Sequence, residues 1–254
     1  QLEDPLATKN FRSPTLDLDS VYGEGPGVSP HLYARDAETL ALTDALLIGQ
    51  TITGGRDPDI PAGLPNDLQR NKHGRAIIGD ERNDENLIVA QTHLLFIKFH
   101  NKVLENLISE GHPKKGRFEE ARRIVTWHYQ WIVLFDFVER LTEPGIINTI
   151  RHEGRKFYRF KEKPYMPVEF SAACYRLGHS MVRQQYNHNR VFSDTGFDLL
   201  FLFTGKSGKI SGDLAALSGG FESLPSDWII DWQRFYEVQS NNQNLNFSRK
   251  IDTS

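Results

Sequence analysis

Residues 87–104 constrain the fold of this chain more than any other stretch of its sequence. They read L-I-V-A-Q-T-H-L-L-F-I-K-F-H-N-K-V-L, and the first half of the run is apolar nearly all round at the helical period. A helix without a polar face has to be covered on every side by the rest of the protein. The run therefore predicts a central, buried helix.

Two histidines share one stripe of this expected helix. His93 and His100 are seven residues apart, which is two helical turns. A pair of histidines on one face can hold a metal ion, but the H-E-x-x-H pattern of a metal hydrolase is absent. We favour buried, hydrogen-bonded core histidines, and we keep a His-ligated metal hydrolase as a weaker alternative.

The composition is that of a soluble globular protein. The 254 residues include 25% charged and 39% hydrophobic residues, and the formal net charge is -3. This balance gives no basic field for a nucleic acid, and no apolar run reaches the roughly 18 residues of a membrane span. Cys174 is the single cysteine, so no intrachain disulfide can form. The sequence starts at Gln1 without a signal-like segment or an initiator methionine, which indicates a chain that is trimmed, processed or expressed as a fragment. Compartment and oligomeric state remain unknown.

Other segments carry weaker signals of secondary structure. Residues 118–141 predict a second long helix whose aromatic side chains are mostly buried. Residues 36–51 show a weak helical pattern, and residues 227–236 predict a short amphipathic helix with two tryptophans. Residues 53–73 are expected to form a long loop, and loops of this length usually have a function or pack over something.

Residues 167–183 predict a helix that carries a lone histidine. The stretch reads P-V-E-F-S-A-A-C-Y-R-L-G-H-S-M-V-R, and its apolar residues form one helical stripe. His179 falls on the opposite face, beside Ala172, Tyr175 and Val182 instead of lysine or glutamate. Such neighbours indicate that something flat and apolar lies against the imidazole. The alternative is a partly buried histidine that bonds a backbone carbonyl.

Oxygen-bearing side chains alternate with other residues near the start of the chain. They are Ser13, Thr15, Asp17 and Asp19. In an extended segment the four side chains lie on one side, where two carboxylates and two hydroxyls make a partial calcium site. The alternative is a polar turn that leads into the apolar residues beyond it.

Three stretches, in this order along the chain, resemble one family, the animal-type haem peroxidases of the peroxidase–cyclooxygenase superfamily. L-D-L-D-S-V-Y-G at 16–23 resembles its calcium-loop segment, D-x-S-x-V-Y-G. G-D-E-R-N-D-E-N at 79–86, before a helix that ends in K-F-H-N-K, resembles its G-D-x-R-x-x-E segment and R-E-H-N-R helix. A-A-C-Y-R-L-G-H-S at 172–180 resembles its proximal-histidine helix, A-A-F-R-x-G-H-S/T. The likeness covers most of the chain and is greatest to bacterial members.

The resemblance implies a single, mainly α-helical peroxidase-like domain over residues 1–254, with little β-structure. It implies that His179 binds the haem iron, that Arg82 is the distal cation, and that Glu85 is the residue esterified to haem in some relatives. Asn86 stands where some relatives have a haem-bonded methionine, which excludes that link. The implied reaction oxidises halides or small organic donors with hydrogen peroxide, and the calcium loop implies calcium.

Functional residues of the family are missing from two expected places in this sequence. Neither Q-x-x-x-H nor D-H-D occurs ahead of Ser13, where the family's distal histidine and its acidic calcium ligand would lie. The asparagine that bonds the proximal histidine normally lies further toward the C-terminus than this chain extends. We therefore expect a domain that is incomplete at both ends and a poor catalyst by itself. A second hypothesis is a catalytically silent α-helical haem-binding or interaction module of the same fold.

Overall fold

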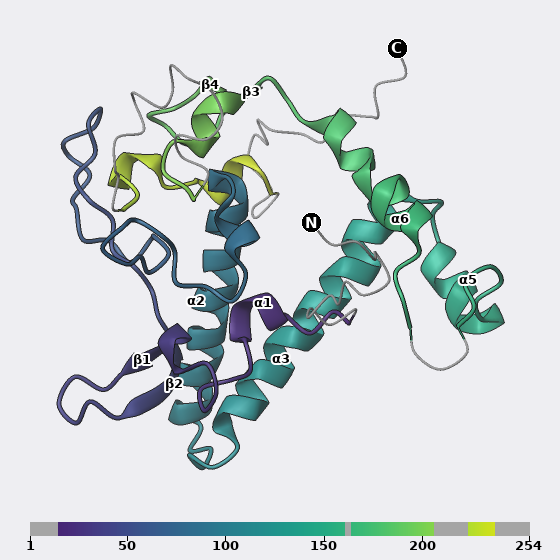
Figure 1. Ribbon diagram of the computed structural model, residues 1–254, viewed down its shortest axis with the longest axis horizontal. Coiled ribbons are helices and arrows are strands. Elements are labelled where there is room, and N and C mark those ends of the chain that lie inside the picture. Colours follow the sequence, from purple (N-terminus) through teal and green to yellow (C-terminus); the bar gives the residue numbers. More distant parts are fainter. Residues whose placement is uncertain (1–14, 161–163, 206–222, 237–254) are drawn as a thin grey trace, which may run out of the picture.

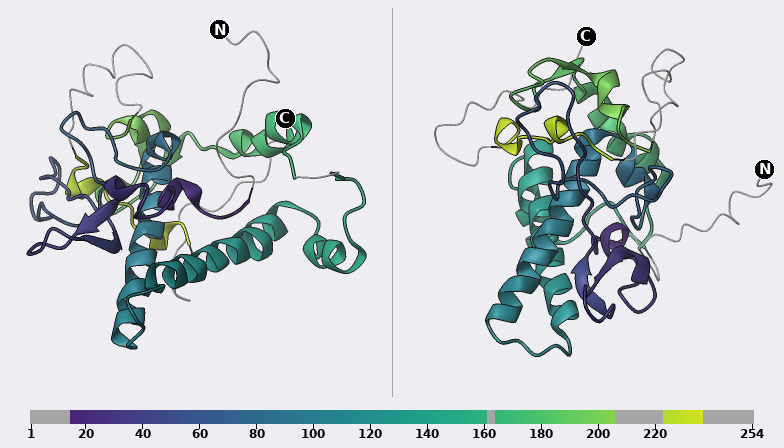
Figure 2. Two further views of the ribbon diagram at one scale, coloured as in Figure 1. Left: turned by 60° about the horizontal axis from the view of Figure 1, so that its bottom comes forward. Right: turned by 90° about the vertical axis from the view of Figure 1, so that its left-hand side faces the viewer.

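Two long helices lie at the centre of the structure, a computed structural model that describes residues 15–160, 164–205 and 223–236. They are α2 (Leu87–Ser109) and α3 (Arg117–Ile132). A short loop joins them at the bottom of Figure 1, and from there they splay apart. Figure 2 shows the same divergence, with the second half of α3 clear of α2.

Helix α2 is the central helix that the sequence predicts, but it is buried along one broad side and not all round. The side chain of Asn86 starts it by accepting a hydrogen bond from the amide of Val89. The buried residues of its first half lie along one broad side: Leu87, Ala90, Gln91, His93, Leu94 and Ile97. On the opposite side Val89 is 37% exposed and Leu95 is 38% exposed. The helix continues five residues beyond the predicted end, to Ser109.

Helix α3 continues as one rod, as predicted, through the π-helical turn η4 (Val133–Phe137) into α4 (Val138–Leu141). The expectation that its aromatic side chains are mostly buried is wrong. Trp127 is 57% exposed and Trp131 is 59% exposed, because this half of the rod diverges from α2 (Figure 1). The guanidinium of Arg123 covers the ring of Trp127 at 4.1 Å.

A β-hairpin occupies part of the segment where the sequence shows a weak helical pattern. Strand β1 (Tyr33–Arg35) pairs antiparallel with β2 (Leu42–Leu46). Between them the Asp36 carboxylate accepts hydrogen bonds from the amide and the hydroxyl of Thr39, both at 2.8 Å, which folds the chain into a tight turn. Asn101 of α2 then bonds both the amide and the carbonyl of Leu46. Local turn chemistry and docking on α2 therefore override the weak helical pattern.

The remaining elements are short. They are α1 (Asp19–Tyr22), η2 (Pro30–Leu32), η3 (Glu81–Asp84), α5 (Ile146–Glu153), α6 (Val168–Ala172), η5 (Cys174–Met181), β3 (Gln185–Tyr186), β4 (Thr195–Gly196), η6 (Phe197–Phe201), η7 (Ser226–Trp228) and η8 (Trp232–Arg234). Strands β3 and β4 pair antiparallel. Two 3-10 turns, η7 and η8, replace the amphipathic helix expected over 227–236, whereas 53–73 is a loop as predicted.

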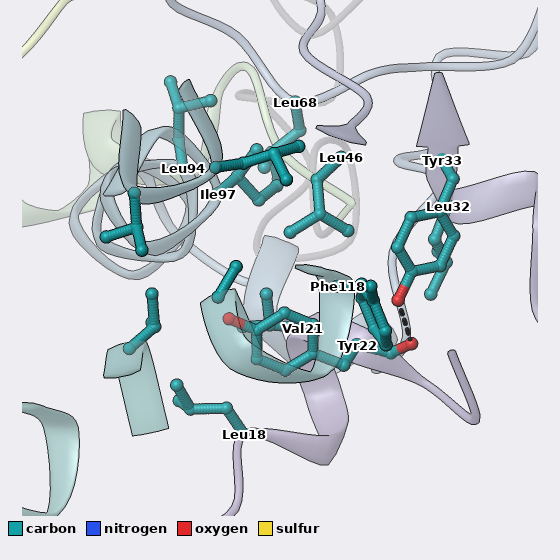
Figure 3. Close-up of a cluster of buried hydrophobic side chains, with 14 of the residues drawn as sticks. Leu18, Val21, Tyr22, Leu32, Tyr33, Leu46, Leu68, Leu94, Ile97 and Phe118 are labelled. Carbon is teal, nitrogen blue, oxygen red and sulfur yellow. Dashed lines mark hydrogen bonds between the residues drawn. The ribbon is translucent and has the colours of Figure 1, made fainter. Parts of the chain in front are cut away.

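Two hydrophobic clusters hold these elements together. The first joins α1, the hairpin, α2 and α3 around Tyr22, Tyr33 and Phe118, whose rings meet edge to face (Figure 3). The second gathers residues of the later segments, including Phe192 and Trp228, around the first residue of α2. Helix α2 thus belongs to both clusters, the first along most of its length from Ala90 to Leu107 and the second at Leu87.

One ring in the second cluster is buried without a hydrogen bond. His188 is fully buried, and within the described residues neither of its ring nitrogens has a partner. The ring stacks on Phe192, with centroids 5.2 Å apart and planes 11° apart. Burial, with a smaller effect of the Arg234 cation, lowers the pKa of His188 from 6.5 to about 4. The folded protein therefore holds a neutral imidazole.

We predict that His188 makes the protein acid-sensitive. The loss of stability begins as the pH falls below 6.5, where the unfolded histidine takes a proton, and is complete near pH 4, where the folded one does. The shift corresponds to about 3 kcal/mol. Urea unfolding at about pH 7 and pH 4 measures how far the free energy of unfolding falls between them. This fall should be smaller by about 3 kcal/mol in His188→Phe than in the unchanged protein. His152→Phe, at an exposed position on α5, should behave as the unchanged protein does. Equal slopes for the unchanged protein and His188→Phe would contradict a buried neutral imidazole.

Candidate functional site

The turn before α2 carries two of the predicted site residues. Asp80 caps η3 by accepting a hydrogen bond from the amide of Arg82 at 3.0 Å. The same carboxylate pairs with the guanidinium of Arg82, with Nη2 2.6 Å from Oδ2 and Nε 3.0 Å from Oδ1. This pairing raises the pKa of Arg82. The Arg82 side chain is 73% exposed, and within the described residues its Nη1 donates to no protein atom. Arg82 is therefore an oriented positive charge with an N–H group available to a ligand.

Glu85 lies at the end of the same turn. Its side chain is exposed, and its carbonyl accepts a hydrogen bond from the hydroxyl of Thr204 at 2.9 Å. It stands three residues after Arg82 and directly before the residue that caps α2. The structure therefore brings Arg82 and Glu85 together on one turn, as the sequence pattern predicts.

A buried arginine binds this turn on the side that faces the protein interior. Only 4% of the Arg70 side chain is exposed, and its guanidinium bonds both carboxylate oxygens of Asp84, at 2.7 and 3.0 Å. It also bonds Asp67, at 3.1 and 3.2 Å, and the carbonyls of Gly74 and Phe203. Asp84 lies between Arg82 and Glu85, so the cluster fixes the backbone that presents both. Sequence reasoning missed Arg70, whose only signal is an acidic residue three positions earlier in a long loop.

The candidate calcium residues lie beside this turn. A side chain on Gly79 would place its Cβ 2.5 Å from the carbonyl oxygen of Ser20, so glycine allows α1 to pack directly on the segment that leads to Arg82. Thr15 donates to Asp17 at 3.0 Å, and Asp17 accepts from the amide of Asp19 at 3.2 Å.

The extended conformation expected for the candidate calcium residues is not formed throughout. Leu18 has a φ of 59°, in the left-handed region, and α1 begins at the next residue. Thr15, Asp17 and Asp19 are therefore gathered in one turn, and Ser13 lies outside the described residues. Across the described ranges no group of three or more histidine, cysteine or acidic side chains forms a metal cluster.

His179 lies in a different part of the molecule. The single helix expected over 167–183 is broken at Ala173 (φ -120°, ψ -73°), where α6 ends and the 3-10 helix η5 follows. The expected apolar stripe is not buried, and Phe170 is 44% exposed. A short helix without packing is only marginally stable, which explains the break. Figures 1 and 2 place α6 and the segment after it beyond the far end of α3, away from the start of α2.

The surroundings of His179 suit a flat apolar ligand. The side chain is exposed, and in the part of the chain that the structure describes neither ring nitrogen takes part in a hydrogen bond. Phe170, Tyr175 and Val182 expose apolar surface in the same segment. An imidazole without partners and an apolar surface are what the axial ligation of haem requires. His179 and Arg82 therefore fit haem by their chemistry, although the structure does not bring them to opposite sides of one cavity.

His93 and His100 are hydrogen-bonded core residues, as favoured above. The amide nitrogen of Asn83 lies 2.9 Å from Nδ1 of His93. His100 contacts the hydroxyl of Tyr22 and the carbonyl of Asp44. The two rings have separate partners, which disfavours the two-histidine metal site.

No helix of the described residues is both long enough and apolar enough to cross a bilayer.

Comparison with known proteins finds one matching family and several related proteins. The family description "Animal haem peroxidase" matches residues 2–203. A peroxidase-like protein of Margaritifera margaritifera is 29% identical over 115 residues, which are 43% of this chain and 14% of the relative. Thyroid peroxidase of Mus musculus is 25% identical over 191 residues, 70% of this chain and 20% of the relative. Chorion peroxidase of Drosophila melanogaster is 29% identical over 124 residues, 44% of this chain and 15% of the relative. The match thus spans a fifth or less of these relatives' own length.

We predict that the Arg70 cluster dominates the stability of the Arg82 turn. Arg70→Met leaves two buried carboxylates without their cation, which should lower the free energy of unfolding by about 3–5 kcal/mol. Arg75→Met, in the same loop, removes only an exposed pair with Glu81 and should cost less than about 1 kcal/mol. Urea unfolding of both variants makes the comparison. Similar small losses in the two would show that Arg70 does not anchor the turn.

Proposed function

The chain belongs to the animal haem peroxidase family, and from that premise we propose that it is a haem-dependent peroxidase that oxidises halides or small organic donors with hydrogen peroxide. The observation that carries the proposal is the exposed imidazole of His179, free of hydrogen bonds within the described residues and flanked by apolar side chains. We also treat residues 1–254 as one peroxidase-like domain. The names of the relatives support peroxidase chemistry and leave the reducing donor open.

His179 would hold the haem through one ring nitrogen. When bound, haem supplies the iron that exchanges electrons with peroxide, chemistry that no side chain of this protein provides. No hydrogen bond of the imidazole would have to break before it binds the iron, because it forms none with the described residues. Its apolar neighbours would cover part of the macrocycle and exclude water from it.

Arg82 would stabilise the negative charge that develops on the departing oxygen of peroxide. A guanidinium stays protonated at every relevant pH, and its pairing with Asp80 fixes its direction. Such a preorganised charge acts without reorganisation at the moment of bond cleavage. Glu85, on the same turn, would be the carboxylate esterified to haem.

The turn at the start of α1 would hold a calcium ion. Thr15, Asp17 and Asp19 lie in one turn, and carboxylate and hydroxyl oxygens are the ligands that calcium prefers. Ser13 would complete the set. Because α1 packs on Gly79, an ion in this turn would also stiffen the segment that leads to Arg82.

A specific observation favours a second candidate, a catalytically silent haem-binding or interaction module of the same fold. The rod of α3 and η4 exposes Trp127, Trp131 and Phe137, and large exposed apolar areas mark interaction sites. A visible spectrum separates the candidates. A peroxidase shows a strong Soret band that changes on addition of hydrogen peroxide, whereas a silent module shows either no band or an unresponsive one.

We predict that His179→Ala removes most haem retention. Loss of an outer-shell partner alone typically costs about 10–100-fold in metal affinity, so loss of the axial nitrogen should cost at least about tenfold. The ratio of Soret to protein absorbance after gel filtration measures it, with His152→Ala, also exposed, as the matched control. Haem content and spectrum equal to those of the unchanged protein would rule out His179 as the ligand.

We predict that Glu85 forms the covalent link to haem. Acid–acetone extraction should leave part of the haem on the unchanged polypeptide, and Glu85→Gln should release it, because an amide does not form the ester. Glu81→Gln, an exposed glutamate of the same turn, should retain it. Complete extraction of haem from the unchanged protein would exclude the ester.

A further inference from the structure

A buried tyrosine and a buried histidine form a directed hydrogen-bond chain in the first cluster. Tyr22 and His100 are both fully buried, and the Tyr22 hydroxyl lies 3.2 Å from Nδ1 of His100. On the other side of the ring, Nε2 lies 3.0 Å from the carbonyl oxygen of Asp44. A carbonyl only accepts hydrogen bonds, so Nε2 must carry the proton. Burial lowers the pKa of His100, which keeps the ring neutral and leaves a lone pair on Nδ1 for the phenol.

This arrangement supplies what a buried phenol needs in order to be oxidised. A phenol that loses an electron becomes strongly acidic, so its proton must pass to a base within hydrogen-bond reach. The fully buried Tyr22 has no access to solvent as that base, and Nδ1 of His100 takes its place. Burial also raises the pKa of Tyr22, so the phenol is protonated at rest and loses its proton only together with an electron.

Tyr33 provides an internal contrast. It is equally buried, and its hydroxyl donates to the backbone carbonyl of Tyr22 at 2.9 Å (Figure 3). A carbonyl accepts a hydrogen bond but does not take up a proton at any relevant pH. Of these two neighbouring phenols, only Tyr22 has a base.

Tyr22 is connected to the candidate distal turn through α1. Tyr22 ends α1, and the carbonyl of Ser20 in the same helix packs on Gly79, three residues before Arg82. The His100 ring belongs to α2 and lies thirteen residues after its first residue, about 20 Å along the helix axis. The phenol thus lies at the end of the helix that packs on the segment leading to Arg82.

We propose that Tyr22 is a redox-active residue that stores one oxidising equivalent as a neutral tyrosyl radical, with His100 as its proton acceptor. The proposal rests on the proposed function, because the oxidant is the one that haem generates from hydrogen peroxide. The phenol gives one electron to that oxidant, and its proton passes to Nδ1 of His100, which leaves a neutral radical and an imidazolium. A reducing substrate returns the electron, and the proton then returns to the phenolic oxygen.

The test uses the haem-loaded full chain, mixed with hydrogen peroxide without a reducing donor and freeze-quenched for electron paramagnetic resonance. We expect a tyrosyl signal, identified by its narrowing when ring-deuterated tyrosine is incorporated. Tyr22→Phe should remove most of this signal, because phenylalanine has no hydroxyl group and cannot form the radical. Tyr33→Phe should leave it unchanged. An equal signal in the unchanged protein and Tyr22→Phe would overturn the proposal.

A second variant covers the case in which Tyr22→Phe does not fold. His100→Gln keeps a hydrogen-bond acceptor opposite the phenol but removes the base, so it should lower the signal while circular dichroism shows the fold retained. A full signal in folded His100→Gln would equally overturn the proposal.

The Soret band of the same samples separates this proposal from the proposed function. A band that does not respond to peroxide means that the proposed function has failed. The tyrosine is then tested in the haem-free protein with photogenerated tris(bipyridine)ruthenium(III) as the one-electron oxidant. A component of the radical signal that is lost in Tyr22→Phe and kept in Tyr33→Phe supports the pair, and identical signals in all three proteins overturn it.

Discussion

A single buried guanidinium, that of Arg70, joins parts of the chain that are far apart in the sequence. It bonds Asp67 in its own loop, Asp84 before α2, and the carbonyl of Phe203 after η6. Asp67 in turn accepts the amide of Leu224 at 2.8 Å. Removing such charges from water costs several kcal/mol per ion, and only complete hydrogen bonding offsets that cost. The position of the Arg82 turn, and of the second cluster around the start of α2, depends on this cluster remaining fully paired.

The parts of the fold that the sequence predicts are those in which a regular pattern coincides with tertiary packing. Helix α2 has an apolar sequence, and its buried residues lie along the broad side that packs on the rest of the protein. The rod that starts with α3 is found within one residue of its expected ends. Several of its aromatic residues are exposed, because periodicity predicts a helix without fixing the angle between that helix and its partner. The hairpin was missed because Asp36 and Asn101 determine it, one through a turn and the other from a distant helix.

The sequence also predicts some parts of the candidate site and not others. Arg82 and Glu85 lie on one turn because they are close in sequence and a helix start orders them. The local helix around His179 was predicted wrongly, because an amphipathic pattern produces a continuous helix only when its apolar stripe is covered. Arg70 could not be predicted, since buried ion pairs formed by loop residues leave no periodic trace in a sequence. Motifs of neighbouring residues thus transfer well to the structure, whereas contacts between distant segments do not.

The π-helical turn η4 changes the direction in which the rod presents its side chains. Each residue of an α-helix advances about 100° around the axis. A π-helical turn contains more residues, so it changes the direction in which all later side chains point. Residues of α4 therefore continue a different face from the one that Ala121 and Val125 bury against α2. On that rotated face Glu139 accepts a hydrogen bond from the amide of Gly145 at 2.8 Å, at the start of α5. The extra residue in one turn thus lets a single rod serve two neighbours, with its first half packed on α2 and its last turn capping α5.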